Sequence, residues 1–332
     1  SQDVARIPSW SLPHYQEIEY AVALIDQLRW PEMVRFVKTG SEATEAAMRI
    51  ARVVTGRPEI ASVGYHGWHT IHDSGDRDAL GIPWGWPCMK RFEYGEDRLW
   101  AKGFAAILIE PVLHQAPPPG YLERLRKECT EFGTLLIFDE VVSGFRWAIG
   151  GASEYFGVTP DLACYGKAMA NGWPLACVVG KRELMEEGGK YISGTFGGEL
   201  HSLVTAHRTL KCYQDEGVIE DIWKAGERLQ RGFNEAAATL KAPFEMRGYP
   251  CKPYIYVTEP RDAEDTRLIS LLLQEAAARG VLLHPTSLCV SASHNRDGVI
   301  ERAVEVLHLA MLAIVNGAGL QGLPSRPIFK RT

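Results

Sequence analysis

Short apolar runs alternate with longer helical patterns through the first two-thirds of this 332-residue chain, and this alternation limits the possible folds most strongly. The predicted strands are Met33–Val37, Ile60–Val63, Ala105–Ile109, Leu135–Asp139, Leu162–Tyr165 and Ala176–Val179. Between them, Glu42–Val54 and Tyr121–Phe132 carry apolar residues at helical spacing. Continuous apolar strands separated by helices are typical of a parallel sheet with two covered faces. We therefore predict an α/β fold with a mostly parallel sheet covered by helices.

The pattern changes after about Tyr213, which indicates a second domain. Here we predict the helices Ile219–Leu240, Asp262–Arg279 and Asp297–Asn316 and the strands Pro253–Val257 and Val281–His284. This arrangement favours a smaller α/β domain after the large one. We place the large domain at residues 1–215 and the small C-terminal domain at residues 216–332, a division that suits the chain's length.

Composition excludes several function classes. A net charge of −5 gives no basic surface for nucleic acid. No apolar run approaches the roughly 20 residues that a helix needs to cross a membrane, so we expect no membrane partner. The seven cysteines are odd in number and scattered, without a Cys-x-x-Cys pair. This pattern favours a reduced, cytoplasmic protein over a disulfide-stabilised one.

Asp139 is the last residue of one predicted parallel strand, and Lys167 follows another. In an open α/β sheet, ligands and chemistry gather at the carboxyl ends of the strands. A lysine can form a Schiff base with pyridoxal phosphate, and an aspartate can keep its pyridine nitrogen protonated. Taken singly, the lysine could be a solvated surface residue and the aspartate a turn-former. The pair predicts a pyridoxal-phosphate site.

Two further segments could hold such a cofactor. Thr39, Gly40 and Ser41 open the first strong helix, where free backbone N–H groups and the helix dipole favour a phosphate. The same residues would equally make an ordinary N-cap. Tyr65 ends the next strand and could stack on a flat ring, although a core aromatic would also occupy that position.

His66, His69 and His72 offer a competing metal hypothesis, because imidazole is a common zinc ligand. Residues three apart share a face only on a helix, and Gly67 and the β-branched Thr70 argue against a helix here. No His-Glu-x-x-His signature is present. We therefore expect no metal, and a histidine-bound metal hydrolase remains the alternative from another class.

Several motifs together carry a resemblance to a known enzyme family. The run Phe36–Arg52 (FVKTGSEATEAAMRIAR) is similar to the family's phosphate-loop helix. The block Leu136–Arg146 (LIFDEVVSGFR) followed by Gly150–Lys167 (GGASEYFGVTPDLACYGK) is its most specific part. Gly194–Gly198 (GTFGG) and Val290–His294 (VSASH) extend the resemblance, which covers roughly residues 11–312. The family that these motifs resemble is the class III aminotransferases, and its glutamate-1-semialdehyde aminomutase-like branch is the most similar.

The resemblance implies a fold-type I enzyme that works as a homodimer with active sites at the subunit interface. Lys167 would be the Schiff-base lysine and general base, and Asp139 would pair with the pyridinium nitrogen. Val141 and Tyr65 would contact the two ring faces. The remaining cofactor-binding candidates are Thr39, Gly40 and Ser41 at the phosphate, Thr195 reaching the phosphate of the neighbouring subunit, and His66, Glu110 and Gln115 near the pocket.

This sequence departs from the family pattern in places. The Gly-Asn that usually follows Glu-Pro-Val is replaced by Leu113-His114-Gln115, so Gln115 or His114 would take over the asparagine's contact with the cofactor's phenolic oxygen. Glu199 stands where the family has another polar residue. The family's N-terminal segment has no counterpart, which predicts either a truncated relative or one domain of a larger assembly.

The leading hypothesis is a pyridoxal-phosphate-dependent aminotransferase that moves an amino group between an amine donor and a carbonyl acceptor, both small molecules. The nearest alternative is a glutamate-1-semialdehyde 2,1-aminomutase, which performs both half-reactions on one substrate. A catalytically inactive binding module with the same fold is the third possibility.

Overall fold

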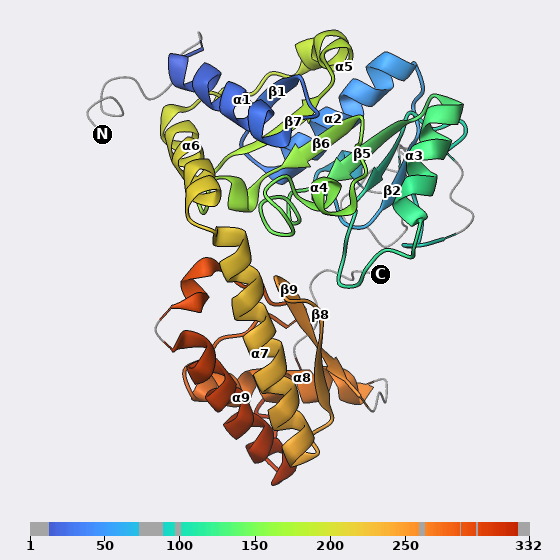
Figure 1. The fold of residues 1–332 in the computed structure, drawn as a ribbon. Coiled ribbons are helices and arrows are strands. Elements are labelled where there is room, and N and C mark those ends of the chain that lie inside the picture. Colours follow the sequence, from blue (N-terminus) through green and yellow to red (C-terminus); the bar gives the residue numbers. More distant parts are fainter. Residues whose placement is uncertain are drawn as a thin grey trace. The chain divides into compact units, whose positions relative to one another are not determined.

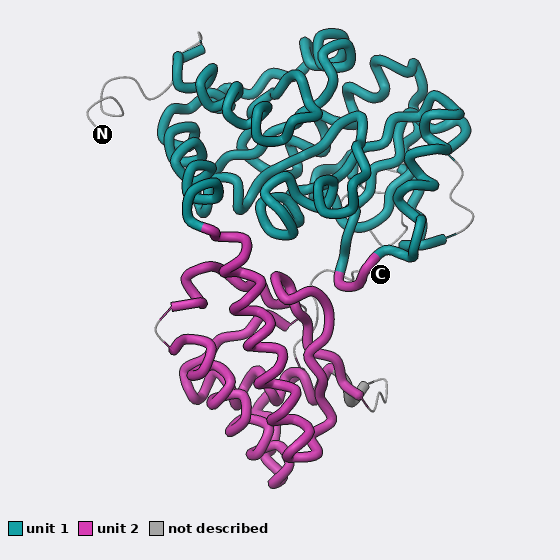
Figure 2. Tube along the Cα trace, in the orientation of Figure 1, with its two compact units in different colours: residues 1–113, 117–216, 332 teal, residues 114–116, 217–331 magenta. Residues whose placement is uncertain are grey.

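The structure is a computed structural model that describes residues 13–72, 89–96, 101–258, 263–285, 287–296 and 298–324. The chain forms two compact units (Figure 2). The first comprises residues 1–113 and 117–216 with residue 332, and the second comprises residues 114–116 and 217–331. The division predicted from the sequence, with one domain ending at residue 215 and the next beginning at residue 216, stays a prediction.

A seven-stranded sheet forms the centre of the first unit (Figure 1). Its strands are β1 (Met33–Val37), β2 (Ile60–Val63), β3 (Met89–Arg91), β4 (Ala106–Ile109), β5 (Leu135–Asp139), β6 (Leu162–Tyr165) and β7 (Ala176–Gly180). Their order in the sheet is β1-β7-β6-β5-β4-β2-β3. Strand β7 runs antiparallel to both of its neighbours, and the other described pairings are parallel. The predicted α/β class with a mostly parallel sheet is confirmed.

Helices cover this sheet because its strands are apolar on both faces. Every residue of β2, β4, β6 and β7 is buried. The helices of the first unit are α1 (Tyr15–Leu28), α2 (Gly40–Thr55), α3 (Tyr121–Phe132), α4 (Ala152–Phe156), α5 (Arg182–Gly188) and α6 (Leu200–Asp215). Helix α2 packs against β1, β4, β5, β6 and β7, and its small buried residues let it lie close to them. It ends at Gly56, whose φ of 65° is the left-handed conformation that glycine adopts without strain.

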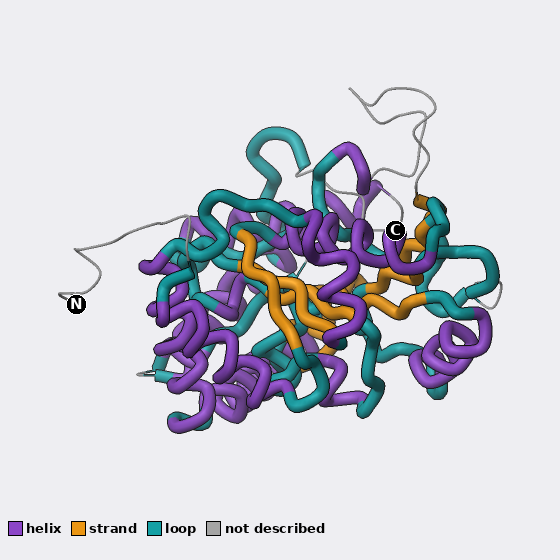
Figure 3. Tube along the Cα trace, turned by 90° about the horizontal axis from the view of Figure 1, so that it is seen from above, coloured by secondary structure: helices purple, strands orange, loops and turns teal. Residues whose placement is uncertain are grey.

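In the described residues, the second unit pairs a hairpin with three α-helices (Figure 1). Its elements are α7 (Val218–Leu240), β8 (Phe244–Tyr249), β9 (Lys252–Val257), α8 (Ala263–Ala278) and α9 (Val299–Val315). Figure 3 shows the strands of the chain in orange and its helices in purple. The strand predicted at Val281–His284 is wrong: this segment has no strand pairing, and Leu282 is 88% exposed. A strand needs a hydrogen-bonded neighbour, and β9 is paired with β8. Among the described residues, no helix has the length and apolar character of a membrane span.

Candidate active site

Five strand ends deliver most of the predicted site residues to one edge of the sheet. Strands β1, β2, β4, β5 and β6 point the same way, since β7 is antiparallel to both β1 and β6. The segments that follow them therefore leave the sheet at its carboxyl edge, where α/β proteins bind ligands. They carry Thr39–Ser41, Tyr65–His66, Glu110, Asp139–Val141 and Lys167, in that strand order.

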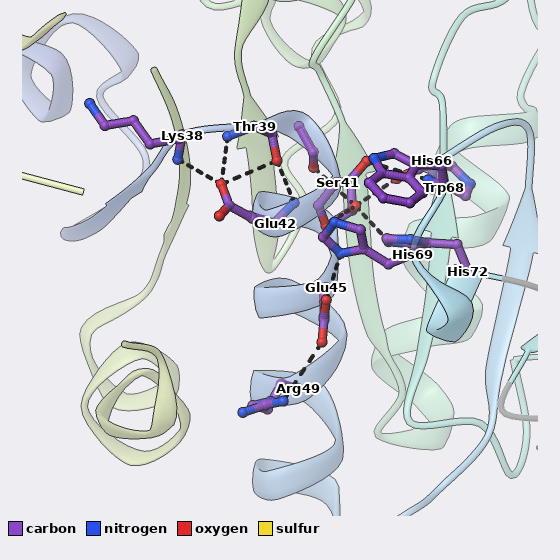
Figure 4. Close-up of polar contacts among 12 residues, drawn as sticks. Lys38, Thr39, Ser41, Glu42, Glu45, Arg49, His66, Trp68, His69 and His72 are labelled. Carbon is purple, nitrogen blue, oxygen red and sulfur yellow. Dashed lines mark hydrogen bonds and ion pairs between the residues drawn. The ribbon is translucent and has the colours of Figure 1, made fainter. Parts of the chain in front are cut away.

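A capping box organises the N-terminus of α2 (Figure 4). The Thr39 hydroxyl accepts the Glu42 amide at 3.2 Å, and Glu42 Oε2 accepts the amides of Lys38 and Thr39 at 2.9 and 2.7 Å. Thr39 is thus the N-cap of α2. This is the role that the sequence left open as an alternative to phosphate binding. The next amides, of Gly40 and Ser41, lie in the first turn, where a helix offers no carbonyl acceptor. They are free to bind an anion at the positive end of the helix dipole.

Asp139 lies at the end of β5, only 5% exposed, with a partner on each carboxylate oxygen. Oδ1 accepts the Val141 amide at 3.1 Å, and Oδ2 lies 2.8 Å from His66 Nδ1. Because the carboxylate accepts, Nδ1 carries the hydrogen of this bond. Nε2 of the same ring is buried without a hydrogen-bond partner among the described residues. This buried His66–Asp139 pair joins two strand ends, and its separation of 73 residues hides it from the sequence.

Val141 forms an apolar wall where β1, β5 and β6 end. A Cβ added to Gly40 would lie 2.8 Å from Val141 Cγ1, which is closer than real side chains pack. Gly166, just before Lys167, would place its Cβ 3.5 Å from the same atom. The Gly166 distance is an ordinary van der Waals contact, so only at position 40 does glycine let the backbone approach Val141 more closely than a side chain would allow.

Glu110 fixes the backbone of Tyr65. The Glu110 carboxylate is buried and accepts the Tyr65 amide at 2.9 Å. Gly64 makes this possible, because a Cβ there would lie 2.8 Å from Glu110 Oε1 and its φ is 104°. The Tyr65 ring is 38% exposed, so it is not the core aromatic of the alternative interpretation.

Lys167 follows β6 with a φ of 46°, a left-handed conformation that non-glycine residues rarely adopt. Backbone strain of this kind often occurs at functional sites, but Arg29 and Lys241 adopt the same conformation as helix C-caps. The side chain is exposed and forms no ion pair with the described residues. Its amine is therefore available for another partner.

Two candidates have no hydrogen bond to this group among the described residues. Gln115 belongs to the second unit, where its amide nitrogen donates to the Tyr254 hydroxyl at 3.0 Å. Thr195 is exposed on the turn before α6. Neither has a described contact with Lys167 or Asp139, so their assignment rests on the resemblance.

The three histidines of the metal hypothesis have separate partners. His66 contacts Asp139, His69 Nδ1 lies 2.7 Å from Glu45 Oε2, and His72 Nε2 lies 2.9 Å from the Thr44 hydroxyl. Burial, together with the nearby His66 and His69, lowers the pKa of His72 to about 4. In the part of the chain that the structure describes, no group of three or more His, Cys, Asp or Glu is placed to hold a metal ion.

Sequence reasoning missed Glu140, which follows Asp139 and is fully buried. Its oxygens accept the amides of Ala152 and Ser153 at 2.9 and 2.7 Å and the Ser143 hydroxyl. Burial raises the pKa of Glu140, while these hydrogen bonds oppose the rise. The carboxylate thus ties the loop between β5 and α4 to the end of β5. A Glu after a strand gives no distinctive signal of this role.

The described residues fit pyridoxal phosphate. The helix start offers two unused amides and the Ser41 hydroxyl for a phosphate. Val141, between Gly40 and Gly166, and the exposed Tyr65 ring offer surfaces for a flat aromatic group. Asp139 offers a buried carboxylate for a protonated ring nitrogen, and Lys167 an unpaired amine for an aldehyde.

Comparisons with known proteins give a consistent result. The family model described as "Aminotransferase class-III" matches residues 86–292. A 3-aminobutyryl-CoA aminotransferase of Cloacimonas acidaminovorans is 38% identical over 68% of this chain and 57% of its own length. A glutamate-1-semialdehyde 2,1-aminomutase of Thermomicrobium roseum is 32% identical over 96% of this chain and 82% of its own.

Among solved structures, the PLP internal aldimine form of the FumI protein of Sphingopyxis sp. MTA144 matches with a TM-score of 0.86. The match covers 95% of this chain and 79% of that chain at 24% identity. At this level of identity, the likeness shows that the two proteins share a fold.

Proposed function

We propose the reaction of this chain, which belongs to the class III aminotransferases and is a pyridoxal-phosphate-dependent enzyme. It moves an amino group from a small amine donor to a separate carbonyl acceptor. The observation that carries this proposal is the placement of a buried aspartate and an unpaired lysine after neighbouring parallel strands. When bound, the cofactor supplies an aldehyde and an electron-accepting ring.

The residues at the carboxyl edge of the sheet have separate roles in the proposed reaction. Lys167 would hold the cofactor through its aldehyde carbon, with loss of water, and once the donor amine has displaced it, the freed Nζ would carry the proton that leaves the amino-bearing carbon of the donor. The Asp139 carboxylate holds a proton on the ring nitrogen, and His66 fixes that carboxylate. The amides of Gly40 and Ser41 bind the phosphate.

The other candidates shape the pocket. Val141 and Tyr65 give the ring an apolar and an aromatic surface to pack on. Thr39 keeps the start of α2 ordered, and Glu110 keeps Tyr65 in place. Gln115 and Thr195 are assigned by resemblance alone, as contacts to the phenolic oxygen and to the partner's phosphate.

The proposal includes a homodimer. Helix α1 carries exposed apolar side chains at helical spacing, namely Tyr15, Ile18 and Val22, and Phe196 beside Thr195 is exposed as well. Exposed apolar surface of this kind favours association. Sedimentation should give twice the mass of the chain, and Ile18→Asp should shift the protein toward monomer. A monomeric wild type would contradict the dimer. We also propose a cytoplasmic location, since the described cysteines form no disulfides with one another.

The aminomutase remains a second candidate, because the Thermomicrobium roseum relative bears that name over nearly the whole chain. The two activities differ in what they need. An aminomutase converts glutamate-1-semialdehyde without any second substrate, whereas the proposed aminotransferase requires both a donor and an acceptor.

Half-reactions with a panel of amine donors test the proposal. A productive donor should convert the bound cofactor into its pyridoxamine form, which is followed by absorbance, and a carbonyl acceptor should restore the aldehyde form. Lys167→Ala should abolish both steps, while Lys181→Ala, which changes an exposed lysine after β7, should leave them intact. Cofactor binding without either step would favour the inactive binding module. Stoichiometric zinc with hydrolysis would favour the metal hydrolase.

A further inference from the structure

A buried hydroxyl links the Tyr65–His66 segment to α2. Thr44 is fully buried, and its Oγ1 lies 2.6 Å from the His66 carbonyl and 2.9 Å from His72 Nε2. The carbonyls of Gly40 and Ser41 are within 3.1 Å of the same oxygen. Thus one hydroxyl meets three carbonyls and one imidazole nitrogen.

Counting hydrogens settles the direction of these bonds. A hydroxyl has a single hydrogen to donate and two lone pairs that accept. The carbonyls can only accept, and the shortest of these contacts is to the His66 carbonyl. The lone pairs of Thr44 therefore face His72, whose Nε2 must carry a hydrogen and donate it. This assignment makes His72 a neutral Nε2–H imidazole, consistent with its lowered pKa of about 4.

The segment next to His66 has no room to shift. A Cβ added to Gly67 would lie 2.5 Å from Ser41 Oγ and 2.9 Å from His72 Cε1, and the φ of Gly67 is 135°. The Trp68 amide also donates to Ser41 Oγ at 3.4 Å (Figure 4). The His66 backbone is therefore held between His72 and the first turn of α2.

We propose that His72 is a positioning residue for the cofactor site: it donates from Nε2 to Thr44, whose hydroxyl holds the His66 carbonyl and so keeps the His66 ring on Asp139. This inference rests on the proposed function for the identity of the ligand. As a neutral group, His72 performs this role without placing a charge beside the His66–Asp139 pair.

Matched substitutions test the proposal through the affinity of the apo-protein for pyridoxal phosphate. His72→Gln keeps an N–H donor the same number of bonds from the backbone, while His72→Leu and Thr44→Val keep the volume and remove the hydrogen bond. Loss of the hydrogen bond between His72 and Thr44 should weaken binding about tenfold in His72→Leu, and His72→Gln should stay within about twofold of wild type. Thr44→Val also removes the bond to the His66 carbonyl, so its loss should be at least as large. The double variant should lose about as much as Thr44→Val alone, because the contact that His72→Leu breaks is already absent there.

His69→Leu is the matched control: His69 is a partly buried neighbour of His72 that pairs with Glu45 and not with Thr44, so its replacement should leave the affinity unchanged. Three results would each overturn the proposal. They are an equal loss of affinity in His72→Gln and His72→Leu, additive losses of affinity in the double variant, and an unchanged affinity in His72→Leu. Thermal unfolding of each apo-variant identifies a folding defect. If His72→Leu does not fold, the comparison of the cofactor affinities of His72→Gln and Thr44→Val tests the proposal instead.

Nitrogen-15 NMR of the apo wild type gives a readout independent of the cofactor. The Nε2–H tautomer of His72 is expected, and the Nδ1–H tautomer would overturn the proposal. The two hypotheses can therefore fail separately. A wild type that takes up no pyridoxal phosphate contradicts the proposed function, whereas normal uptake with the wrong tautomer contradicts only the role of His72.

Discussion

Replacing Asp139 by Asn should separate the chemical role of the carboxylate from its structural one. The Asn oxygen can still accept the Val141 amide, but its NH₂ group would face His66 Nδ1. His66 must then either oppose one donor with another or move its hydrogen to Nε2, which is buried without a described partner. An unsatisfied buried N–H costs about 1–3 kcal/mol, so we expect the free energy of unfolding to fall by that amount.

The rate should fall much further than this structural cost suggests. Asn cannot balance the positive charge of a protonated ring nitrogen, and removing one member of a buried ion pair costs about 3–5 kcal/mol. At the transition state this corresponds to a rate about 10²- to 10⁴-fold lower. The phosphate contacts of α2 and the Lys167 amine remain, so cofactor affinity should fall by about tenfold at most.

The assay combines single-turnover half-reactions, cofactor titration and urea unfolding. Asp161→Asn is the matched control. Asp161 is also buried, but it binds Arg126 and the Leu136 amide at the amino end of β6, away from the carboxyl edge. It should lose stability and keep the half-reaction rate. An Asp139→Asn rate within about threefold of wild type would refute the reasoning.

Three other predictions follow from single contacts. Glu140→Gln should lower the free energy of unfolding by about 1–3 kcal/mol in urea titrations, because one of the two amides bound by the carboxylate would face an NH₂ group, and unchanged stability would contradict this. Gly40→Ala should weaken cofactor binding because its Cβ would meet Val141 at 2.8 Å, and adding Val141→Ala should restore part of the loss in a cofactor titration. Burial tends to raise the pKa of Glu199, but hydrogen bonds from Ser202, Lys38 and His201 hold it at about 2. This carboxylate therefore stabilises the fold above the unfolded pKa near 4.5 and loses that effect as the pH falls toward 2, so wild type should lose more stability than Glu199→Gln over this range.

The continuous apolar runs predicted the sheet well, because a buried parallel strand needs apolar side chains on both faces. Strands β1, β2, β5 and β6 have the predicted bounds, while β4 begins one residue later and β7 ends one residue later. The same criterion failed in the second unit. The strand β8 was missed, because Phe244–Tyr249 alternates apolar residues with Glu and Arg and carries one buried face. Val281–His284 was wrongly predicted, because apolar character alone supplies no partner strand.

Local signals in the site could be predicted, but contacts over long distances could not. The Thr39-x-x-Glu42 spacing is a capping-box signature that the sequence alone contains. The pairing of His66 with Asp139 depends on which strands neighbour each other in the sheet, and a single sequence does not give this order. For that reason His66 was weighed as a metal ligand together with His69 and His72, although the three side chains have different partners.

Borohydride reduction of the protein loaded with pyridoxal phosphate, followed by peptide mass spectrometry, tests the assignment of Lys167 most directly. The account predicts that wild type loses its visible absorbance and carries a pyridoxyl group on Lys167 Nζ, and that Lys167→Ala carries none. A pyridoxyl group on another lysine in place of Lys167, or amino transfer at the wild-type rate in Lys167→Ala, would contradict it.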